Sequence, residues 1–319
     1  MKLKAGHKIL LVLAVLLTAV VLCALPFRVL KQETLYVCTK GQPSSAEAGF
    51  INELRRMGFA VKLNAQDLPK PQTTALWLDT PNALEEMKKS QAEVNFIYTT
   101  AYYPLPLAGQ TKAFVVLTPY RELYEHYVRS NQKTALFSLG INLKDFYNMD
   151  DKKIYTAIYY GDNNKFFPYA EELKQKKDIR FMGNFWPVSF APLQPKTQKQ
   201  KADILNQTDI VIVYNDPASP QSKIIPSELA EAAGCGTMVF STPNPAVAEL
   251  YGNNIITYDT LPDLEEKLAY YLNKRGQTKH ISRALQKITV EKYSSAVTAK
   301  RFKEIQYWLK QNSPKPALR

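Results

Sequence analysis

One short segment of the chain, residues 226–236 with the sequence PSELAEAAGCG, combines residue types that suit the binding of a phosphorylated ligand. Ser227 stands where it can cap the start of a helix, and a helix start offers free N–H groups and a positive dipole end to phosphates. Glu231, one turn later, can accept hydrogen bonds from hydroxyl groups. Gly234 and Gly236 lack a β-carbon and allow close backbone approach. The same pattern also fits a helix packed tightly on a sheet, with Glu231 merely exposed.

Two lysines could supply cations for such phosphates. Gly161 ends a predicted strand at 154–161, and Lys165 follows it. Lys223 lies in the loop at 215–226 that precedes the helix. Because a lysine ammonium binds phosphate as a point charge, either side chain could reach a diphosphate. Either could equally be a solvated surface charge.

Strand and helix patterns alternate along the chain, and the alternation restarts near residue 150. Strands are predicted at 34–39, 60–64, 75–79, 94–100, 113–118, 134–140, 154–161, 179–184, 209–215, 237–242 and 255–259. Helices are predicted at 46–57, 82–91, 121–130, 167–176, 227–234 and 295–311, with two more around 264–272 and 281–288. This alternation predicts an α/β fold of two Rossmann-like domains that face a cleft, each with a mainly parallel sheet.

A longer series of residues gives these elements a family resemblance. The residues beyond the segment at 226–236 are Glu249-Leu250, Tyr270-Tyr271-Leu272, Tyr293 and Arg301. In order and spacing, residues 150–305 resemble the C-terminal domain of group 1 glycosyltransferases of the GT-B fold. Within that group they resemble the branch named for spore maturation protein B. The stretch Trp77-Leu78-Asp79-Thr80-Pro81 also looks like a feature of the family's N-terminal domain.

The resemblance implies a site for a nucleotide diphosphate sugar and no required metal or cofactor. Glu231 matches the position that holds the ribose. The family places the nucleotide base near the loop at 183–186, so Trp186 or Phe185 could stack on the base, or the aromatic could belong to the core. The implied acceptor-side domain spans 32–148, and the implied nucleotide-sugar-binding domain spans 149–311.

Three positions depart from the family pattern. Glu228 replaces a basic residue before the helix, and Lys292 replaces a histidine before Tyr293. Lys223 stands where the first of two glutamates eight residues apart would be. These departures leave the predicted fold intact and put catalysis in doubt.

Asp79 is the best candidate for the acid or base of an inverting reaction, because it lies at the carboxyl end of a predicted strand in the N-terminal half. His126 lies in an amphipathic helix pattern at 121–130 and fits a surface or packing role better. The sequence shows no Ser/His/Asp arrangement and no phosphate P-loop.

The first thirty residues predict a membrane anchor. Residues 9–27 form an uncharged run (ILLVLAVLLTAVVLCALPF) that is close to the length a spanning helix needs. Its exit is a poor cleavage site, which favours an uncleaved anchor over a cleaved signal peptide. The predicted domains therefore begin with a stub and anchor at 1–31 and end with a loose tail at 312–319. The flanking lysines and arginine weakly favour a cytoplasmic N-terminus, so the sequence leaves open on which side of the membrane the predicted domains lie.

The net charge of +12 suits an anionic bilayer surface or an anionic substrate such as a nucleotide diphosphate. A basic cluster stands near the C-terminus, at Lys300, Arg301, Lys303, Lys310, Lys315 and Arg319. No basic stripe interleaved with aromatics and no zinc or RNA-binding motif stands out, so no nucleic-acid partner is predicted. The three cysteines give no sign of a disulfide framework.

Two functions from different classes fit these observations. The first is a membrane-anchored glycosyltransferase that moves a sugar from a nucleotide diphosphate sugar to a cell-surface glycan, lipid or protein. The second is a catalytically degenerate GT-B-fold module that binds a glycan or a partner. The acidic Glu228 beside the expected diphosphate and the weak lean toward a cytoplasmic N-terminus favour the second.

The apolar run should hold the full-length protein in the membrane, because burying about 20 apolar residues is effectively irreversible compared with surface binding. Washing membranes with alkaline carbonate checks this. Full-length protein should stay in the pellet, and its release into the supernatant would contradict an integral anchor.

Overall fold

The computed structural model describes residues 32–67, 69–80, 82–106, 114–162 and 167–312. The chain divides into two compact units, residues 1–33 and residues 34–319. All the elements below belong to the second unit. The predicted anchor at 9–27 lies outside the described residues. Within the described ranges, no helix is both long enough and apolar enough to cross a bilayer.

The first half of this unit is built on a six-stranded parallel sheet with the order β2-β1-β3-β4-β5-β6. Its strands are β1 (Thr34–Thr39), β2 (Ala60–Leu63), β3 (Thr74–Leu78), β4 (Val94–Tyr98), β5 (Val115–Thr118) and β6 (Thr134–Leu136). The helices between them are α2 (Ser45–Arg56), α3 (Ala83–Lys89) and α4 (Arg121–Arg129). Strands β3 and β4 are buried along their whole length, as expected when helices cover both faces.

The second half is built on a five-stranded parallel sheet with the order β11-β10-β9-β7-β8. Its strands are β7 (Tyr155–Tyr160), β8 (Ile179–Met182), β9 (Thr208–Val213), β10 (Met238–Ser241) and β11 (Ile256–Thr257). Its helices are α5 (Ala170–Lys174), α6 (Gln198–Asn206), α7 (Ser227–Gly234), α8 (Pro245–Tyr251), α9 (Leu261–Asn273) and α10 (Arg275–Lys292). The 3₁₀ turns are η2 (Val188–Phe190), η3 (Pro220–Lys223) and η4 (Gly252–Asn254).

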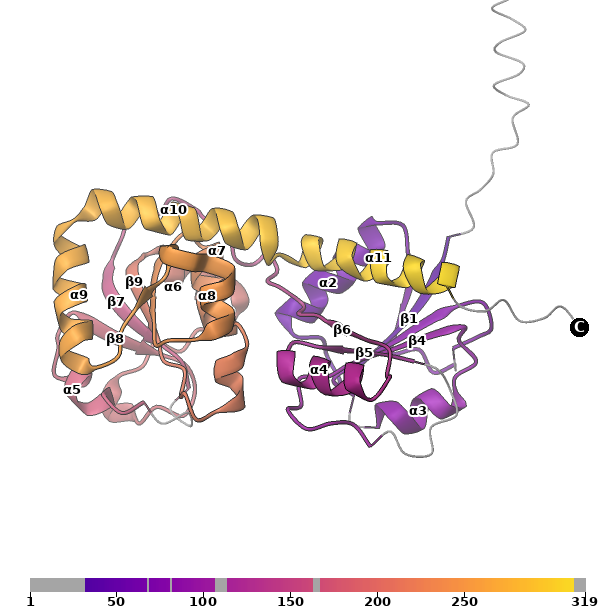
Figure 1. Cartoon of the computed structure of the whole chain (residues 1–319). Helices are drawn as coiled ribbons and strands as arrows, with labels where there is room; N and C mark the ends of the chain where they lie inside the picture. The colour runs from indigo at the N-terminus through magenta and orange to yellow at the C-terminus, as the bar shows by residue number, and fades with distance from the viewer. Residues whose placement is uncertain (1–31, 68, 81, 107–113, 163–166, 313–319) are drawn as a thin grey trace, which may run out of the picture. The chain divides into compact units, whose positions relative to one another are not determined.

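Each sheet has a hydrophobic core on both faces. In the first half, one core joins the sheet to α2 and the final helix α11 (Ser295–Asn312), and the other joins it to α3 and α4. In the second half, one core includes residues of α6, α7, α8 and α10, and the other includes residues of α5 and α9. Both halves are therefore three-layer α/β structures (Figure 1).

Helix α11 returns to the first half after α10. It lies along α2 (Figure 1), and the Phe302 ring packs edge-on against Phe50 at 5.7 Å between centroids and tilted against Phe96 at 4.8 Å. Thus the chain crosses between the two sheets twice, once after β6 and once between α10 and α11.

The two crossing segments are paired through their backbones. The Ile141 N–H donates to the Tyr293 carbonyl at 2.9 Å, and the Ser295 N–H donates to the Ile141 carbonyl at 2.8 Å. Gly140 has φ +69°, and a β-carbon there would lie 2.6 Å from the Tyr293 carbonyl oxygen. Only glycine fits this close approach in a left-handed conformation.

The predicted α/β fold with two parallel sheets is confirmed, and most predicted strands and helices appear within a few residues of the predicted ranges. Helices α6 and α8 were not predicted. The sequence of α6, QKQKADILN, has too few apolar positions to show a helical period, although Thr197 caps it. A signal for α8 was present, because Asn244 caps it and Pro245 begins it. The domain boundaries near 148 and 311 stay predictions.

Candidate functional site

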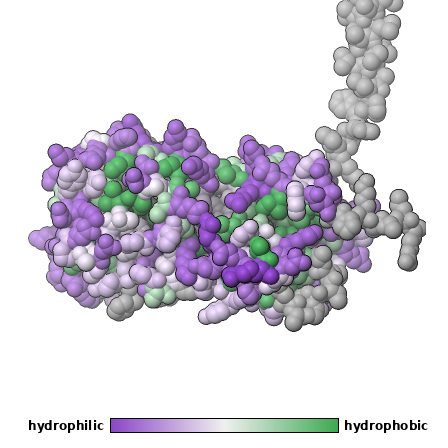
Figure 2. All heavy atoms as spheres, viewed as in Figure 1, coloured by the Kyte–Doolittle hydropathy of each residue, from purple (hydrophilic) through white to green (hydrophobic). Residues whose placement is uncertain are grey.

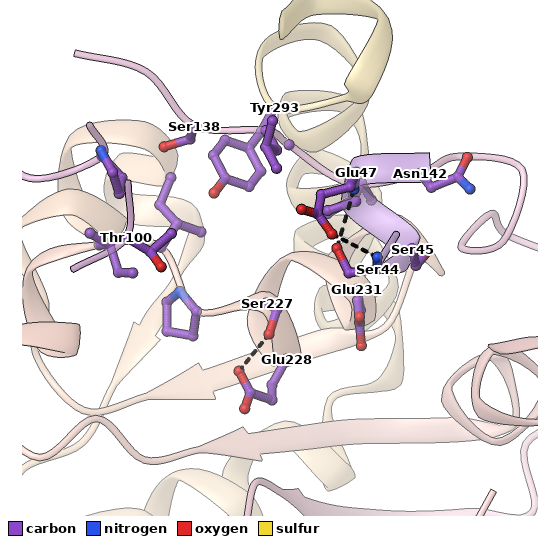
Figure 3. A pocket seen from close by; sticks show the side chains of 18 of the residues that line it. Ser44, Ser45, Glu47, Thr100, Ser138, Asn142, Ser227, Glu228, Glu231 and Tyr293 are labelled. Carbon is purple, nitrogen blue, oxygen red and sulfur yellow. Dashed lines mark hydrogen bonds between the residues drawn. The ribbon is translucent and has the colours of Figure 1, made fainter. Parts of the chain in front are cut away.

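A cavity of about 890 Å³ opens at the carboxyl ends of strands from both sheets. From the first half it is lined by residues that follow β1, β3, β4, β5 and β6 and by the start of α2. From the second half it is lined by the loop after β9 and the start of α7. Figure 3 shows the starts of α2 and α7 on the same pocket. Carboxyl ends of parallel strands are where open α/β sheets bind ligands.

Asp79 lines this cavity directly after β3, in a strained conformation. Its φ is +46°, which costs a residue other than glycine about 1–3 kcal/mol. Its carboxylate accepts hydrogen bonds from the Thr100 backbone N–H at 2.6 Å and the Thr100 hydroxyl at 2.9 Å. Burial raises the pKa of Asp79, and the two bonds from Thr100 oppose that rise. A fixed carboxylate of raised pKa is suited to accept a proton.

The start of α2 places further polar groups on the cavity. The Ser44 hydroxyl accepts from the Glu47 N–H at 3.3 Å, and the Glu47 carboxylate accepts from the Ser44 N–H at 2.7 Å (Figure 3). This capping box fixes the first turn of the helix. Its Ser-x-x-Glu spacing is visible in the sequence, yet the sequence analysis did not include Glu47 in the site.

The start of α7, at Pro226, Ser227 and Glu228, lines the same cavity. Pro226 precedes the helix and no side chain caps it. The prediction that Ser227 caps this helix is wrong, because Ser227 is the first helical residue and its hydroxyl donates to the Glu228 carboxylate at 3.1 Å. Both Ser227 and Glu228 line the cavity. An acidic side chain therefore stands in the first turn, where the positive end of the helix dipole would favour an anion.

Glu231 lines the cavity, and its side chain is largely buried. It is 9% exposed, and its carboxylate accepts from the Tyr160 hydroxyl at 2.5 Å and from the Lys201 ammonium at 3.3 Å. Burial raises the pKa of Glu231, and the charge of Lys201 and the bond from Tyr160 oppose that rise. The alternative that Glu231 is merely exposed is therefore wrong, because Tyr160 of β7 and Lys201 of α6 hold this side chain.

Lys223, one of the two lysines proposed as phosphate ligands, does not line the cavity. Lys223 is ion-paired with Glu122 at 2.9 Å and donates to the Tyr102 hydroxyl at 2.8 Å. Its charge is thus already matched by a residue of α4. Lys165 lies outside the described residues.

Gly161 and Trp186 belong to the core of the second half and do not line the cavity. Trp186 is 6% exposed, and its indole N–H donates to the Gly161 carbonyl at 2.8 Å. Its ring packs against Phe181 and Phe190 at 4.8 and 5.0 Å between centroids. Base stacking by Trp186 is therefore wrong, and the alternative of a core aromatic holds. The loop after β8 approaches Gly161 closely at Gly183, where a β-carbon would lie 2.3 Å from the Gly161 carbonyl oxygen.

Two further parts of the site were not predicted. The loop after β9 brings Tyr214, Asn215 and Asp216 to the cavity, and the Asn215 N–H donates to the Thr242 hydroxyl at 2.8 Å. Tyr293 lines the cavity where the chain crosses back, and burial raises its pKa to about 12. Polar residues directly after a predicted strand were a usable signal for the first part. The role of Tyr293 depends on the tertiary crossing.

The described lining is strongly acidic. Its carboxylates are Glu47, Asp79, Asp216, Glu228 and Glu231, and among the described residues its only lysine is Lys40. In the described ranges, no group of three or more His, Cys, Asp or Glu side chains is placed to hold a metal ion. Hydrogen-bond acceptors for hydroxyl groups therefore dominate this site.

Residues 165–304, under half of the chain, match the family model of glycosyl transferase-like domains. The chain matches no curated protein sequence significantly. The matched range includes α7 and every residue of α7 that lines the cavity. The helix that carries Ser227 and Glu231 therefore lies in a glycosyltransferase-like domain.

Solved structures of low sequence identity share the fold. Sucrose-phosphate synthase from Thermosynechococcus elongatus is 11% identical with a TM-score of 0.61, covering 88% of this chain and 100% of its own. Anabaena HepE in complex with UDP-glucose is 11% identical with a TM-score of 0.60, covering 87% and 100%. A glycosyltransferase involved in avilamycin A biosynthesis is 13% identical with a TM-score of 0.53, covering 88% and 99%. Together with the family model, these likenesses support a glycosyltransferase of the GT-B type.

The raised pKa of Glu231 should make stability depend on pH. Its ordinary value is 4.5. Because the folded-state pKa lies above the unfolded one, the folded state binds more protons between the two values, and stability falls as pH rises through that window. Glu231→Gln removes this pH-dependent contribution to the free energy of unfolding. As the pH rises above about 4.5, the unfolding midpoint of the wild type should therefore drop relative to that of Glu231→Gln.

Denaturant unfolding at several pH values measures this difference. Glu266→Gln, the same change at an exposed site on α9, is the matched control and should leave the pH profile unaltered. A constant difference between the wild type and Glu231→Gln at every pH would contradict the buried-carboxylate description.

Proposed function

We propose that this protein is a membrane-anchored glycosyltransferase that moves a sugar from a nucleotide diphosphate sugar to a cell-surface glycan, lipid or protein. The observation that carries the proposal is the single cavity onto which Asp79 of the first sheet and the start of α7 both open. The glycosyltransferase-like match over 165–304 supports a donor site on the α7 side. The acceptor then enters from the side of the first sheet.

In this proposal the acceptor hydroxyl loses its proton to Asp79 as its oxygen attacks the anomeric carbon of the donor sugar. The bond from that carbon to the phosphate oxygen breaks, and the nucleoside diphosphate leaves. Thr100 holds the Asp79 carboxylate in place through two bonds, so little reorganisation is needed. The uncapped N–H groups at the start of α7 stabilise the negative charge on the leaving group.

The donor's ribose would be bound by Glu231. Its carboxylate is held by Tyr160 and Lys201 and lines the cavity one turn into α7. A carboxylate fixed in this way can accept hydrogen bonds from ribose hydroxyls. We also propose that the protein belongs to the branch named for spore maturation protein B. Only the residues at 226–236 and 249–301 support this assignment.

A catalytically degenerate glycan-binding module is the second candidate. The observation that favours it is the run of carboxylates around the cavity, with Glu228 in the first turn of α7. Carboxylates bind sugar hydroxyls well and repel a diphosphate. The two candidates differ in whether a nucleoside diphosphate binds at all.

Donor affinity should depend on the two glutamates of α7 in opposite directions. Glu231→Gln removes a charge-assisted bond worth about 1.5–3 kcal/mol and should weaken binding about ten- to a hundredfold. Glu228→Gln is the matched change three residues earlier. It removes a like charge beside the phosphates and should strengthen binding. Calorimetric titration of the full-length protein in detergent with several nucleoside diphosphates measures both effects.

Two results of this titration would count against the proposal. If no nucleoside diphosphate binds the wild type, the degenerate module becomes the better account. If one binds the wild type and Glu231→Gln equally, the ribose lies elsewhere.

Turnover should depend on Asp79 without a matching effect on donor binding. Asp79→Asn removes the proton acceptor, and general-base catalysis contributes about 10²–10⁴-fold, so kcat should fall by about that factor. Asp216→Asn, another carboxylate of the cavity, is the control and should change kcat less than about tenfold. Release of nucleoside diphosphate from donor and acceptor mixtures gives the rate. Unchanged kcat in Asp79→Asn would exclude it as the base.

A further inference from the structure

The last two long helices, α10 and α11, carry a large excess of positive charge. Residues 274–312 contain two glutamates, Glu291 and Glu304, against ten basic residues: Lys274, Arg275, Lys279, Arg283, Lys287, Lys292, Lys300, Arg301, Lys303 and Lys310. All of the basic residues except Lys310 are exposed. No ion pair formed within the described ranges engages any of the exposed nine. Figure 2 shows mainly hydrophilic residues along the margin where these helices run in Figure 1.

Two large aromatic side chains stand among these charges on α11. Tyr307 is 64% exposed and Trp308 is 59% exposed, whereas Trp77 and Trp186 are buried. The opposite side of α11 packs into the first core through Phe302 and Leu309. The exposed side thus combines lysine and arginine with Tyr and Trp, the residues that favour the headgroup region of a bilayer.

The chain enters the folded unit next to this surface. Gln306 of α11 donates to the Thr74 hydroxyl at 2.6 Å, and Thr74 is the register partner of Leu35 near the start of β1. The last turns of α11 therefore lie against the strand ends where the folded unit begins. The apolar run ends at Phe27, and residues 28–33 can reach at most about 20 Å when fully extended. If that run spans a bilayer, α11 is held close to the bilayer surface.

We propose that the exposed face of α10 and α11 docks on an anionic lipid surface, with Tyr307 and Trp308 at the depth of the headgroups. Basic residues near a negatively charged leaflet are attracted within a Debye length, and salt screens the attraction. The two helices follow one another along one margin of the folded unit (Figure 1), so docking through both of them orients the unit on the membrane. The partner is the lipid surface, recognised by its charge and its interfacial layer.

A nucleic-acid backbone carries the same charge, but the geometry of α11 fits it less well. Tyr307 and Trp308 are consecutive residues and diverge by about 100° around the helix, so they form no common platform for stacked bases. A bilayer surface accepts both rings at once, because it surrounds the exposed half of the helix.

Trp308 supplies an intrinsic probe, since it is the one exposed residue of three tryptophans. Full-length protein is mixed with vesicles of phosphatidylcholine carrying brominated acyl chains, with or without about 30% phosphatidylglycerol. In the protein recovered with the anionic vesicles, bromine should quench up to about one third of the tryptophan emission. Phosphatidylcholine vesicles, high salt and Trp308→Phe should each remove most of that quenching.

Two triple variants with the same change in net charge distinguish an effect of this face from an effect of the protein's net charge. Lys300→Glu, Arg301→Glu and Lys303→Glu together should abolish the phosphatidylglycerol-dependent quenching. Lys89→Glu, Lys133→Glu and Lys177→Glu together change exposed residues elsewhere and should leave it intact. Equal loss in both triple variants, equal quenching in both vesicle types, or no quenching in recovered protein would overturn the proposal. So would tighter binding to a single-stranded oligonucleotide than to anionic vesicles at physiological salt.

Discussion

The backbone pairing of Ile141 with Tyr293 and Ser295 is the constraint on which the site depends. The two chain crossings between the sheets run side by side there, joined by hydrogen bonds of 2.9 and 2.8 Å. Gly140 must lack a side chain for that approach. The cavity is lined by these same crossings and by the carboxyl ends of strands from both sheets. Residues as distant in sequence as Asp79 and Glu231 therefore share one cavity.

The charge of this cavity shapes the chemistry it can support. Its carboxylates are well placed to bind hydroxyls. Lys201 and Lys223 are already engaged in ion pairs, Lys201 with Glu231 and Lys223 with Glu122. A diphosphate bound here would meet mainly the N–H groups at the start of α7, with Glu228 opposing them. A donor would thus be held by directional hydrogen bonds more than by net charge.

The sequence predicted the fold better than the site. Alternating strand and helix patterns determined the two sheets, because their periods depend on local residue spacing. The residues that make up the site, by contrast, depend on which side chains the folded chain turns toward the cavity. Asp79 and Ser227 line the cavity, as residues at strand and helix ends should. Trp186 instead contacts Gly161 in the core, and Glu231 lines the cavity while held by Tyr160 and Lys201. No spacing rule along the chain reveals such contacts, nor the place of Tyr293 at the crossing.

A crystal structure of the protein grown with a nucleotide diphosphate sugar tests the central claim most directly. The account predicts the diphosphate at the start of α7, the ribose within hydrogen-bond distance of Glu231, and the sugar facing Asp79. A nucleotide found outside this cavity, for instance against the basic side chains of α10, would contradict the account.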